Sequence, residues 1–276
     1  MSKTIAILGK AGVGKTFFSA HLAMAFGYLG DRTLVVGCDQ KRDVSRALSG
    51  NSRPSLMEAL EKADYNFDRV NLENVICSVS SMVDVIELGP SQLLVGHYAG
   101  VLEDAFGLFE ENDLLSRYSH VIFDVTDERF DAVFSPIFRQ VNSAVALTDD
   151  SPESLFVVNR LIRAALIGSY EFNTPLRIVG MVNNRSRDQK VFEKYVERTR
   201  CYPLLTIGEH EELARLRRSR HTLFSMENLS PAMEEIVDHL LKIAELLRGE
   251  PFNLMPVSPM DDEDVWELVP PVHLPN

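Results

Sequence analysis

The chain of 276 residues is 45% hydrophobic and 25% charged, which suits one large α/β domain, or two small ones, and disfavours disordered and fibrous folds. Its net charge of −12 disfavours general binding to nucleic acids, because most of the surface would repel a phosphate backbone. No apolar run reaches the roughly 20 residues that span a bilayer, and the N-terminus lacks the pattern of a signal peptide, so we expect a cytoplasmic protein without a membrane span.

Short apolar runs alternate with helical patterns along most of the chain. The runs have the length and composition of buried strands in a parallel sheet, and lie at residues 4–9, 33–37, 83–88, 120–125, 143–148 and 176–182. Between them, apolar residues recur at spacings of three and four, which predicts helices at residues 17–29, 102–115, 152–166 and 190–199. This alternation predicts an α/β fold with a doubly wound, mostly parallel sheet flanked by helices.

The end of the chain changes character. A last helix is predicted from Pro231, with Ser230 as its N-cap, to a stop at Gly249. Residues 250–276 then contain six prolines and the acidic cluster DDEDVWE. We therefore expect one domain over residues 1–249 and a Pro-rich acidic tail at 250–276 that is extended and either disordered or laid across a surface.

Residues 9–16, GKAGVGKT, fit the phosphate-loop pattern G-x-x-x-x-G-K-[ST] between a predicted strand and a predicted helix. Glycines let backbone N–H groups turn towards a triphosphate, the lysine reaches the outer phosphates, and the hydroxyl of the last residue ligates Mg²⁺. The predicted ATP contacts are Gly12, Val13, Gly14, Lys15, Thr16 and Phe17, with Thr16 also on the metal. The alternative is a glycine-rich turn that merely connects a strand to a helix.

Lys10 is a second lysine within this loop, and its position points it away from a phosphate held by the backbone of its own loop. The form G-K-x-G-x-G-K-T resembles the deviant phosphate loop of the family that includes the nitrogenase iron protein, the ParA and MinD partition ATPases and the arsenite-pump ATPases. The resemblance implies a nucleotide-gated homodimer in which Lys10 acts in trans on the phosphates of the partner subunit, as an arginine finger does. The alternative is an exposed, solvated lysine.

Three acids extend the resemblance. Residues 35–48, VVGCDQKRDVSRAL, resemble the first switch of the nitrogenase iron protein. One carboxylate of such a switch can orient the attacking water, and the other can bind Mg²⁺ through its waters. We assign the first role to Asp39 and the second to Asp43. The alternative is that both acids cap the following helix. Asp124 ends a predicted strand at the position where this fold places the second-switch acid on the Mg²⁺ side.

The C-terminal half narrows the match. Residues 180–228 resemble the ATP-binding L subunit of dark-operative protochlorophyllide reductase, and the likeness spans most of residues 3–245. It implies that Asn184, or Asn183 in a shifted register, contacts adenine, with Arg185 beside it at the nucleotide. The alternative is that the asparagine only forms the turn after the strand. The basic run of Arg215, Arg217, Arg218 and Arg220 forms either a solvated helix face or a contact with the nucleotide or an acidic partner.

Members of the nitrogenase iron protein and protochlorophyllide reductase type bridge their dimer with a [4Fe-4S] cluster, to which each subunit gives two cysteine thiolates. His97 stands at the first of these positions, and Phe130 or Asp131 at the second. The three cysteines, Cys38, Cys77 and Cys201, lie elsewhere. We therefore expect ATP and Mg²⁺ without a cluster, with a pair of His97 ligands as the alternative.

Together these features predict a homodimeric ATPase switch that couples its nucleotide state to docking on a protein partner, in assembly, maturation or regulation. One alternative is an ATP-dependent reductase component that carries a [4Fe-4S] cluster on unusual ligands. Another is a ParA-like positioning ATPase, which would need a basic face such as the 215–220 run.

Overall fold

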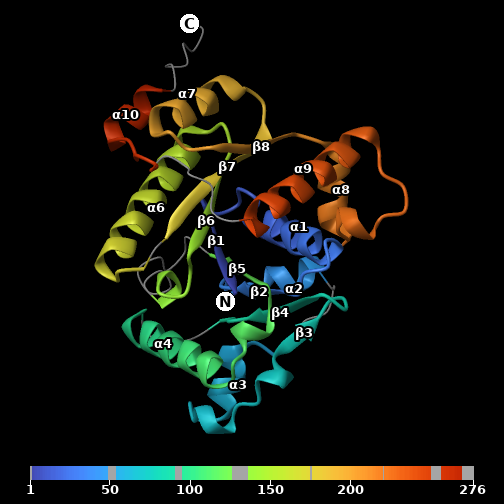
Figure 1. Cartoon of the computed structure of the whole chain (residues 1–276), viewed down its shortest axis with the longest axis vertical. Helices are drawn as coiled ribbons and strands as arrows, with labels where there is room; N and C mark the ends of the chain where they lie inside the picture. The colour runs from blue at the N-terminus through green and yellow to red at the C-terminus, as the bar shows by residue number, and fades with distance from the viewer. Residues whose placement is uncertain are drawn as a thin grey trace, which may run out of the picture.

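The computed structural model describes residues 2–48, 54–90, 95–125, 136–174, 176–219, 221–249 and 256–268. Within these ranges one sheet runs through the molecule, in the strand order β3-β4-β2-β5-β1-β6-β7-β8 (Figure 1). Its strands are β1 (Lys3–Gly9), β2 (Thr33–Gly37), β3 (Ile76–Ser78), β4 (Val83–Glu87), β5 (His120–Asp124), β6 (Ser143–Thr148), β7 (Arg177–Ser186) and β8 (Pro203–Gly208). Neighbouring strands are parallel except β3, which is antiparallel to β4. The doubly wound, mostly parallel sheet predicted from the sequence is confirmed.

Helices cover both faces of this sheet (Figure 1). One face carries α1 (Lys15–Tyr28), α2 (Asp43–Leu48), α8 (Glu211–Ser219) and α9 (Pro231–Arg248). The other carries α3 (Leu56–Lys62), α4 (Val95–Glu111), α6 (Pro152–Glu171), α7 (Gln189–Thr199) and α10 (Asp262–Glu267). Short 3₁₀ turns lie at Phe67–Arg69, Leu72–Asn74, Leu115–Arg117 and Leu223–Ser225. No helix in the described ranges is long and apolar enough to cross a membrane.

The two cores follow from the period of the strands. In β1, Ile5 and Ile7 pack towards α1 and α9, whereas Ala6 and Leu8 pack towards the opposite helices. Successive side chains of a strand point to opposite faces, so a strand covered on both sides is apolar throughout. This is why each of the six runs predicted to be strands forms one, at or within four residues of its expected ends.

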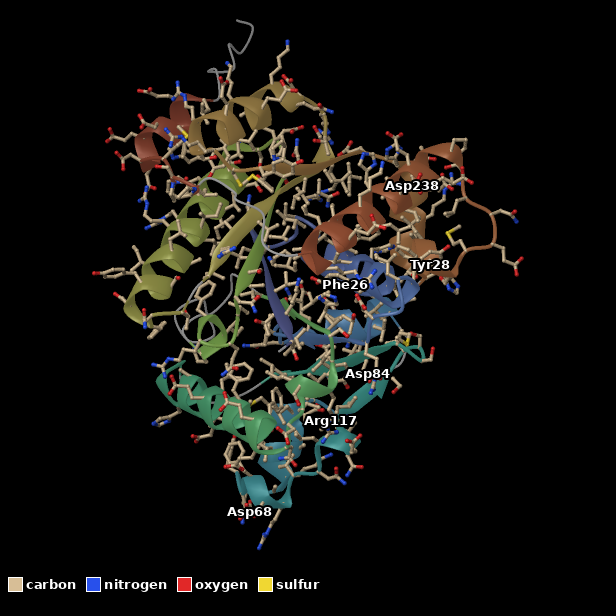
Figure 2. All side chains as sticks on the ribbon, in the orientation of Figure 1. Phe26, Tyr28, Asp68, Asp84, Arg117 and Asp238 are labelled. Atoms are coloured by element: carbon tan, nitrogen blue, oxygen red, sulfur yellow. The ribbon has the colours of Figure 1, made fainter. Side chains whose placement is uncertain are left out.

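The two strands at the sheet edges were not predicted. β3 spans only three residues and its last residue is exposed. β8 begins at Pro203, which has no N–H to donate to a neighbouring strand, and only two of its residues are buried. Asp84 of β4 (labelled in Figure 2) stabilises the β3 edge of the sheet. Its carboxylate accepts hydrogen bonds from Ser78 Oγ at 2.6 Å and Tyr118 Oη at 2.9 Å.

The last long helix, α9, begins after Ser230, as predicted, but the Ser230 hydroxyl does not cap it. The hydroxyl instead donates to Glu212 Oε2 at 2.6 Å, which ties the start of α9 to α8. Proline is tolerated at this first helical position, because an N–H group there would have no partner within the helix.

The described part of the tail lies against α6. Asn159 Nδ2 donates to the Met260 carbonyl at 2.8 Å, and Met260 N donates to Asn159 Oδ1 at 3.0 Å. The side chains of Met260, Val265 and Leu268 are buried. Residues 256–268 therefore lie across a surface, one of the two predicted arrangements, but residues 262–267 are helical where an extended chain was expected. The domain boundary at residue 249 stays a prediction.

Candidate functional site

The loop between β1 and α1 turns at glycines whose backbone angles other residues rarely adopt. Gly12 has a φ of 78° and Gly14 a φ of 104°. Gly14 is also the N-cap residue of α1, and no side chain caps this helix. The N–H groups of the first helical turn can therefore donate to an anion, and the helix dipole adds a partial positive charge there.

Lys15 bends back over this loop. Its Nζ donates to the carbonyl oxygens of Gly9 at 2.7 Å and Lys10 at 3.0 Å. The residue is only 9% exposed. The loop carbonyls thus hold the ammonium beside the N-terminus of α1, so two sources of positive charge meet at one place.

A cavity of about 240 Å³ opens next to the loop. It brings together residues that are distant in the sequence, namely Gly12, Gly14, Lys15 and Thr16 of the loop and the acids Asp39, Asp43 and Asp124. Lys10 is not among the residues described as lining it. The cavity therefore assembles most of the predicted phosphate and metal contacts and leaves Lys10 outside.

Asp124 is the buried acid of this cavity. It ends β5, is 3% exposed, and accepts hydrogen bonds from Thr16 Oγ1 at 2.7 Å and Ser19 Oγ at 3.1 Å. Burial raises the pKa of Asp124, whereas the hydrogen bond from Thr16, the charge of Lys15 and the hydrogen bond from Ser19 lower it. Ser19 was not predicted as a site residue, although its spacing of three from Thr16 places both hydroxyls on one face of α1.

Asp39 and Asp43 lie between β2 and the first turn of α2, and both are partly buried. Asp39 Oδ1 accepts a hydrogen bond from Lys41 N at 2.8 Å, which closes a local turn and does not cap the helix. Asp43 is the first residue of α2 and lies 3.7 Å from Arg46 Nη1. The charge of Asp39 raises the pKa of Asp124, so these two acids act within one electrostatic site.

The donor set suits Mg²⁺ held together with phosphate groups. In the described part of the chain, no group of three or more His, Cys, Asp or Glu side chains is arranged to hold a metal ion. A phosphate-bound Mg²⁺ needs fewer protein ligands, because phosphate oxygens and waters complete its octahedron. The hydroxyl of Thr16 and the carboxylate of Asp124 are hard oxygen donors in contact with each other, so the residues present fit this metal.

The end of β7 braces the other side of the loop. Asn184 Nδ2 donates to the Val13 carbonyl at 2.7 Å, and Arg185 Nη2 donates to the Gly12 carbonyl at 2.8 Å. Asn183 faces away, since its Nδ2 donates to Asp150 Oδ1 at 2.8 Å. The structure thus places Asn184 rather than Asn183 against the phosphate loop, and contact with a base stays a prediction.

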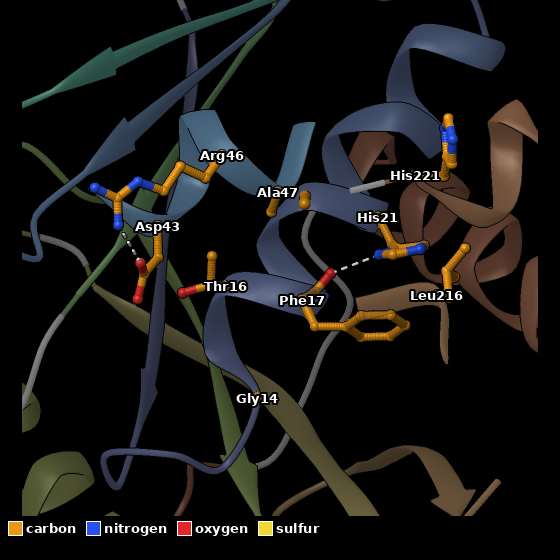
Figure 3. A pocket seen from close by; sticks show the side chains of 10 residues that line it. Gly14, Thr16, Phe17, His21, Asp43, Arg46, Ala47, Leu216 and His221 are labelled. Carbon is orange, nitrogen blue, oxygen red and sulfur yellow. Dashed lines mark hydrogen bonds and ion pairs between the residues drawn. The ribbon is translucent and has the colours of Figure 1, made fainter. Parts of the chain in front are cut away.

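A second cavity, of about 340 Å³, adjoins the first and shares Gly14, Thr16 and Asp43 with it (Figure 3). Phe17 lines this second cavity together with Leu216 of α8. Next to them, Leu223 N donates to His21 Nε2 at 3.1 Å, so His21 Nδ1 carries the proton and donates to the Phe17 carbonyl at 2.7 Å. These bonds fix the segment after α8 to α1, directly behind the phosphate loop.

Arg215, Arg217 and Arg218 of the basic run lie on α8. Arg215 pairs with Glu211 at 2.8 Å, and both side chains are largely exposed. This matches the solvated-face alternative for Arg215. The side chains at positions 217, 218 and 220 lie outside the described residues.

Comparison with known proteins identifies the family. The sequence matches the family described as 4Fe-4S iron sulfur cluster binding proteins, NifH/frxC family, over residues 3–274. The chain belongs to the NifH/frxC family. It is 29% identical over 275 residues to the light-independent protochlorophyllide reductase iron-sulfur ATP-binding protein of Chlorobium luteolum, covering 98% of this chain and 99% of that protein. The resemblance predicted from the loop, the switch and the C-terminal half is therefore confirmed.

Solved structures agree on the fold. The cell division ATPase MinD of Pyrococcus furiosus is similar with a TM-score of 0.67 and 17% identity, over 89% of this chain and 100% of that one. A ParA family ATPase of Chlorobium tepidum is similar with a TM-score of 0.66 and 19% identity, over 87% of this chain and 98% of that one. At these identities the likeness shows the phosphate-loop ATPase fold alone.

The thiols of this NifH/frxC member do not fit a bridging cluster. Cys38 follows β2, Cys77 lies in β3 and Cys201 follows α7, and all three are buried. Burial raises the pKa of Cys38, and raises that of Cys201 to about 12, which disfavours the thiolates that iron requires. His97 is exposed on α4. Positions 130 and 131 lie outside the described residues, and neither is a cysteine.

Proposed function

We propose that this chain is a cytoplasmic, homodimeric ATPase switch without an iron–sulfur cluster, which couples its nucleotide state to docking on a protein partner. The observation that carries the proposal is the 240 Å³ cavity, where Lys15 and the N-terminus of α1 meet Asp39, Asp43 and Asp124. The positive charge in this cavity suits a triphosphate, and its acids suit the Mg²⁺ that accompanies a triphosphate. Similarity to an iron-sulfur ATP-binding protein supports the ATP part of this proposal. The description of the family names a 4Fe-4S cluster, so the proposed absence of a cluster rests on the residues of this chain at the cluster positions.

In this mechanism each residue has one task. The loop N–H groups and Lys15 bind the phosphates, while Asn184, Arg185 and Phe17 contact the nucleoside. Thr16 and Asp124 would hold Mg²⁺, and Asp43 would bind it through water. Bound Mg²⁺ supplies charge that neutralises the phosphate oxygens. Asp39 orients the attacking water.

The position of Lys10 supports the proposed dimer. Its carbonyl accepts hydrogen bonds from Val13 N at 3.2 Å and Lys15 Nζ at 3.0 Å, so its backbone is part of the loop. Its side chain is partly exposed and is not among the described lining of its own phosphate cavity. A cation held beside the cavity but outside it can serve the phosphates of a second subunit, which supports action in trans.

Asp39 is tested by replacement with asparagine. Asp39→Asn should leave ATP binding within a few-fold of the wild type and slow hydrolysis by about 10²-fold, since the change removes a water-orienting carboxylate and leaves the loop intact. Steady-state ATPase assays and calorimetry measure the two effects. The matched control is Asp68→Asn, an exposed acid at the far end of the molecule (Figure 2). Unchanged turnover in Asp39→Asn would remove Asp39 from the mechanism.

The reductase alternative is tested by iron analysis. Protein purified without oxygen should be colourless and contain no stoichiometric iron or sulfide, because the sequence has no cysteine at either cluster position. A brown dimer with about four irons, as a [4Fe-4S] cluster requires, would overturn the proposal and favour an electron-transfer component.

A ParA-like role on DNA is disfavoured by the net charge of −12 and by the pairing of Arg215 with Glu211.

A further inference from the structure

Glu87 is a buried acid that lies outside the described lining of the cavity but contacts the helix that carries Asp43. It ends β4, is 4% exposed, and its Oε1 accepts a hydrogen bond from Ser45 N at 2.7 Å. Ser45 is the third residue of α2, two positions after Asp43. The first N–H groups of a helix have no partner within it, so a carboxylate from a neighbouring strand satisfies one of them here.

We propose that Glu87 is a positioning residue for ATP hydrolysis, which holds the first turn of α2 and thereby sets where Asp43 stands relative to Mg²⁺. This inference rests on the proposed function. It assigns to Glu87 no contact with the nucleotide or the metal; Glu87 acts through the backbone of α2.

The carboxyl group of Glu87 is packed closely against the backbone of β2. Gly37 of β2 is the register partner of Glu87 across the sheet. A Cβ atom at position 37 would lie well inside contact distance of Glu87 Oε2, and 3.2 Å from Val44 Cγ2 of α2. The absent side chain of Gly37 therefore makes room for the carboxyl group, at the point where β2, β4 and α2 meet.

The electrostatics link Glu87 to two of the three cavity acids. Burial raises the pKa of Glu87 to about 7; the hydrogen bonds from Ser45 lower it, and the charges of Asp124 and Asp43 raise it. Glu87 Oε2 is buried without a hydrogen-bond partner in the described residues. Burying a carboxyl group with one oxygen unbonded costs folding free energy. The hydrogen bond to α2 is the role that we assign to this buried acid.

The ion pair between Asp43 and Arg46 constrains Asp43 only weakly. Asp43 and Arg46 lie 3.7 Å apart with side chains that are 46% and 52% exposed, and exposed ion pairs contribute little. The buried hydrogen bond from Ser45 N to Glu87 is therefore the firmer hold on this turn. Groups that orient metal ligands from behind typically change metal affinity by about 10- to 100-fold when removed.

The test is a cycle of variants at Glu87 and Gly37, read by the Mg²⁺ concentration that gives half-maximal ATPase activity at saturating ATP. Glu87→Ala should raise this concentration by about 10-fold or more. Glu87→Gln keeps an oxygen acceptor for Ser45 N and should restore most of the wild-type value. Gly37→Ala should reproduce the defect, because its methyl group displaces the carboxyl group of Glu87.

The double variant Gly37→Ala/Glu87→Ala separates positioning from packing. Its new methyl group enters the space that Glu87 leaves, so its unfolding temperature should recover relative to the single variants while the Mg²⁺ requirement stays raised. Recovery of both together would show that Glu87 only fills space, and would overturn the inference. Asp84→Ala is the matched control, since it removes a buried acid from the opposite end of β4 and should leave the Mg²⁺ requirement unchanged.

Hydrogen exchange gives a readout that needs no nucleotide. The Ser45 amide should exchange faster in Glu87→Ala than in the wild type, and Glu87→Gln should restore its protection. A wild-type chain that does not hydrolyse ATP would overturn the proposed function and this inference with it. An active wild type, with an unchanged Mg²⁺ requirement in Glu87→Ala, would overturn the inference alone.

Discussion

Replacing Lys15 by alanine should abolish ATP binding. Lys15 Nζ lies 2.7 Å from the Gly9 carbonyl and 3.0 Å from that of Lys10, on the wall of the phosphate cavity. ATP offers this ammonium charged oxygens in place of neutral carbonyls, so it should swing from the loop to the outer phosphates. Without it, the backbone donors face the triphosphate alone. Calorimetry should then detect no binding at concentrations that saturate the wild type.

The control for this variant is Lys62→Ala, which removes an exposed lysine from the last turn of α3. It should bind ATP as the wild type does. Thermal unfolding of Lys15→Ala must also show a folded protein, because the substitution removes two hydrogen bonds within the loop. A folded Lys15→Ala protein with normal ATP affinity would defeat the phosphate-loop assignment.

Replacing Lys10 by alanine should have a different effect. The single subunit should still bind ATP, because its own Lys15 and loop N–H groups are intact. Hydrolysis should fall by at least ~10²-fold, scaled down from the loss of an arginine finger, since the charge that the partner supplies to the phosphates is missing in the transition state. Calorimetry and ATPase assays on the same preparation measure binding and turnover separately.

Mixing the two variants decides whether Lys10 acts in trans. In a dimer of one Lys10→Ala and one Lys15→Ala subunit, the first keeps its own Lys15 and receives Lys10 from the second. That site is complete and should recover, whereas the other site lacks both lysines. Each mixed dimer should therefore regain one active site, although either variant alone is inactive. If mixed dimers form and stay inactive, Lys10 serves its own subunit and the dimer mechanism is wrong.

The phosphate loop and the parallel sheet could be predicted because their signals are local. Gly9, Lys15 and Thr16 follow one another within eight residues, and strands buried on both faces are continuously apolar. The acids Asp39, Asp43 and Asp124 could be assigned because the segments around them resemble the two switches of the nitrogenase iron protein family. The structure brings these acids to the loop, as expected. Their chemical roles stay predictions.

Features that depend on long-range contacts could not be predicted. Glu87 meets Ser45 across 42 residues of sequence, and at the end of an apolar strand it looks like a surface residue. The choice between Asn183 and Asn184 depends on which face of β7 each one occupies, and this is settled by packing. The α10 helix forms because Met260, Val265 and Leu268 find a place against the main core, whereas the proline content of the tail indicated an extended chain.

The burial of all three cysteines makes the chain convenient for site-specific labelling. Maleimide reagents react with accessible thiolates, and buried thiols with raised pKa values react slowly. A single cysteine introduced at Tyr170, which is 89% exposed on α6, would therefore take up a fluorophore selectively without removal of the native cysteines. Energy transfer between labelled chains would then test the proposed dimer, and would show whether its subunits approach and separate when ATP is added.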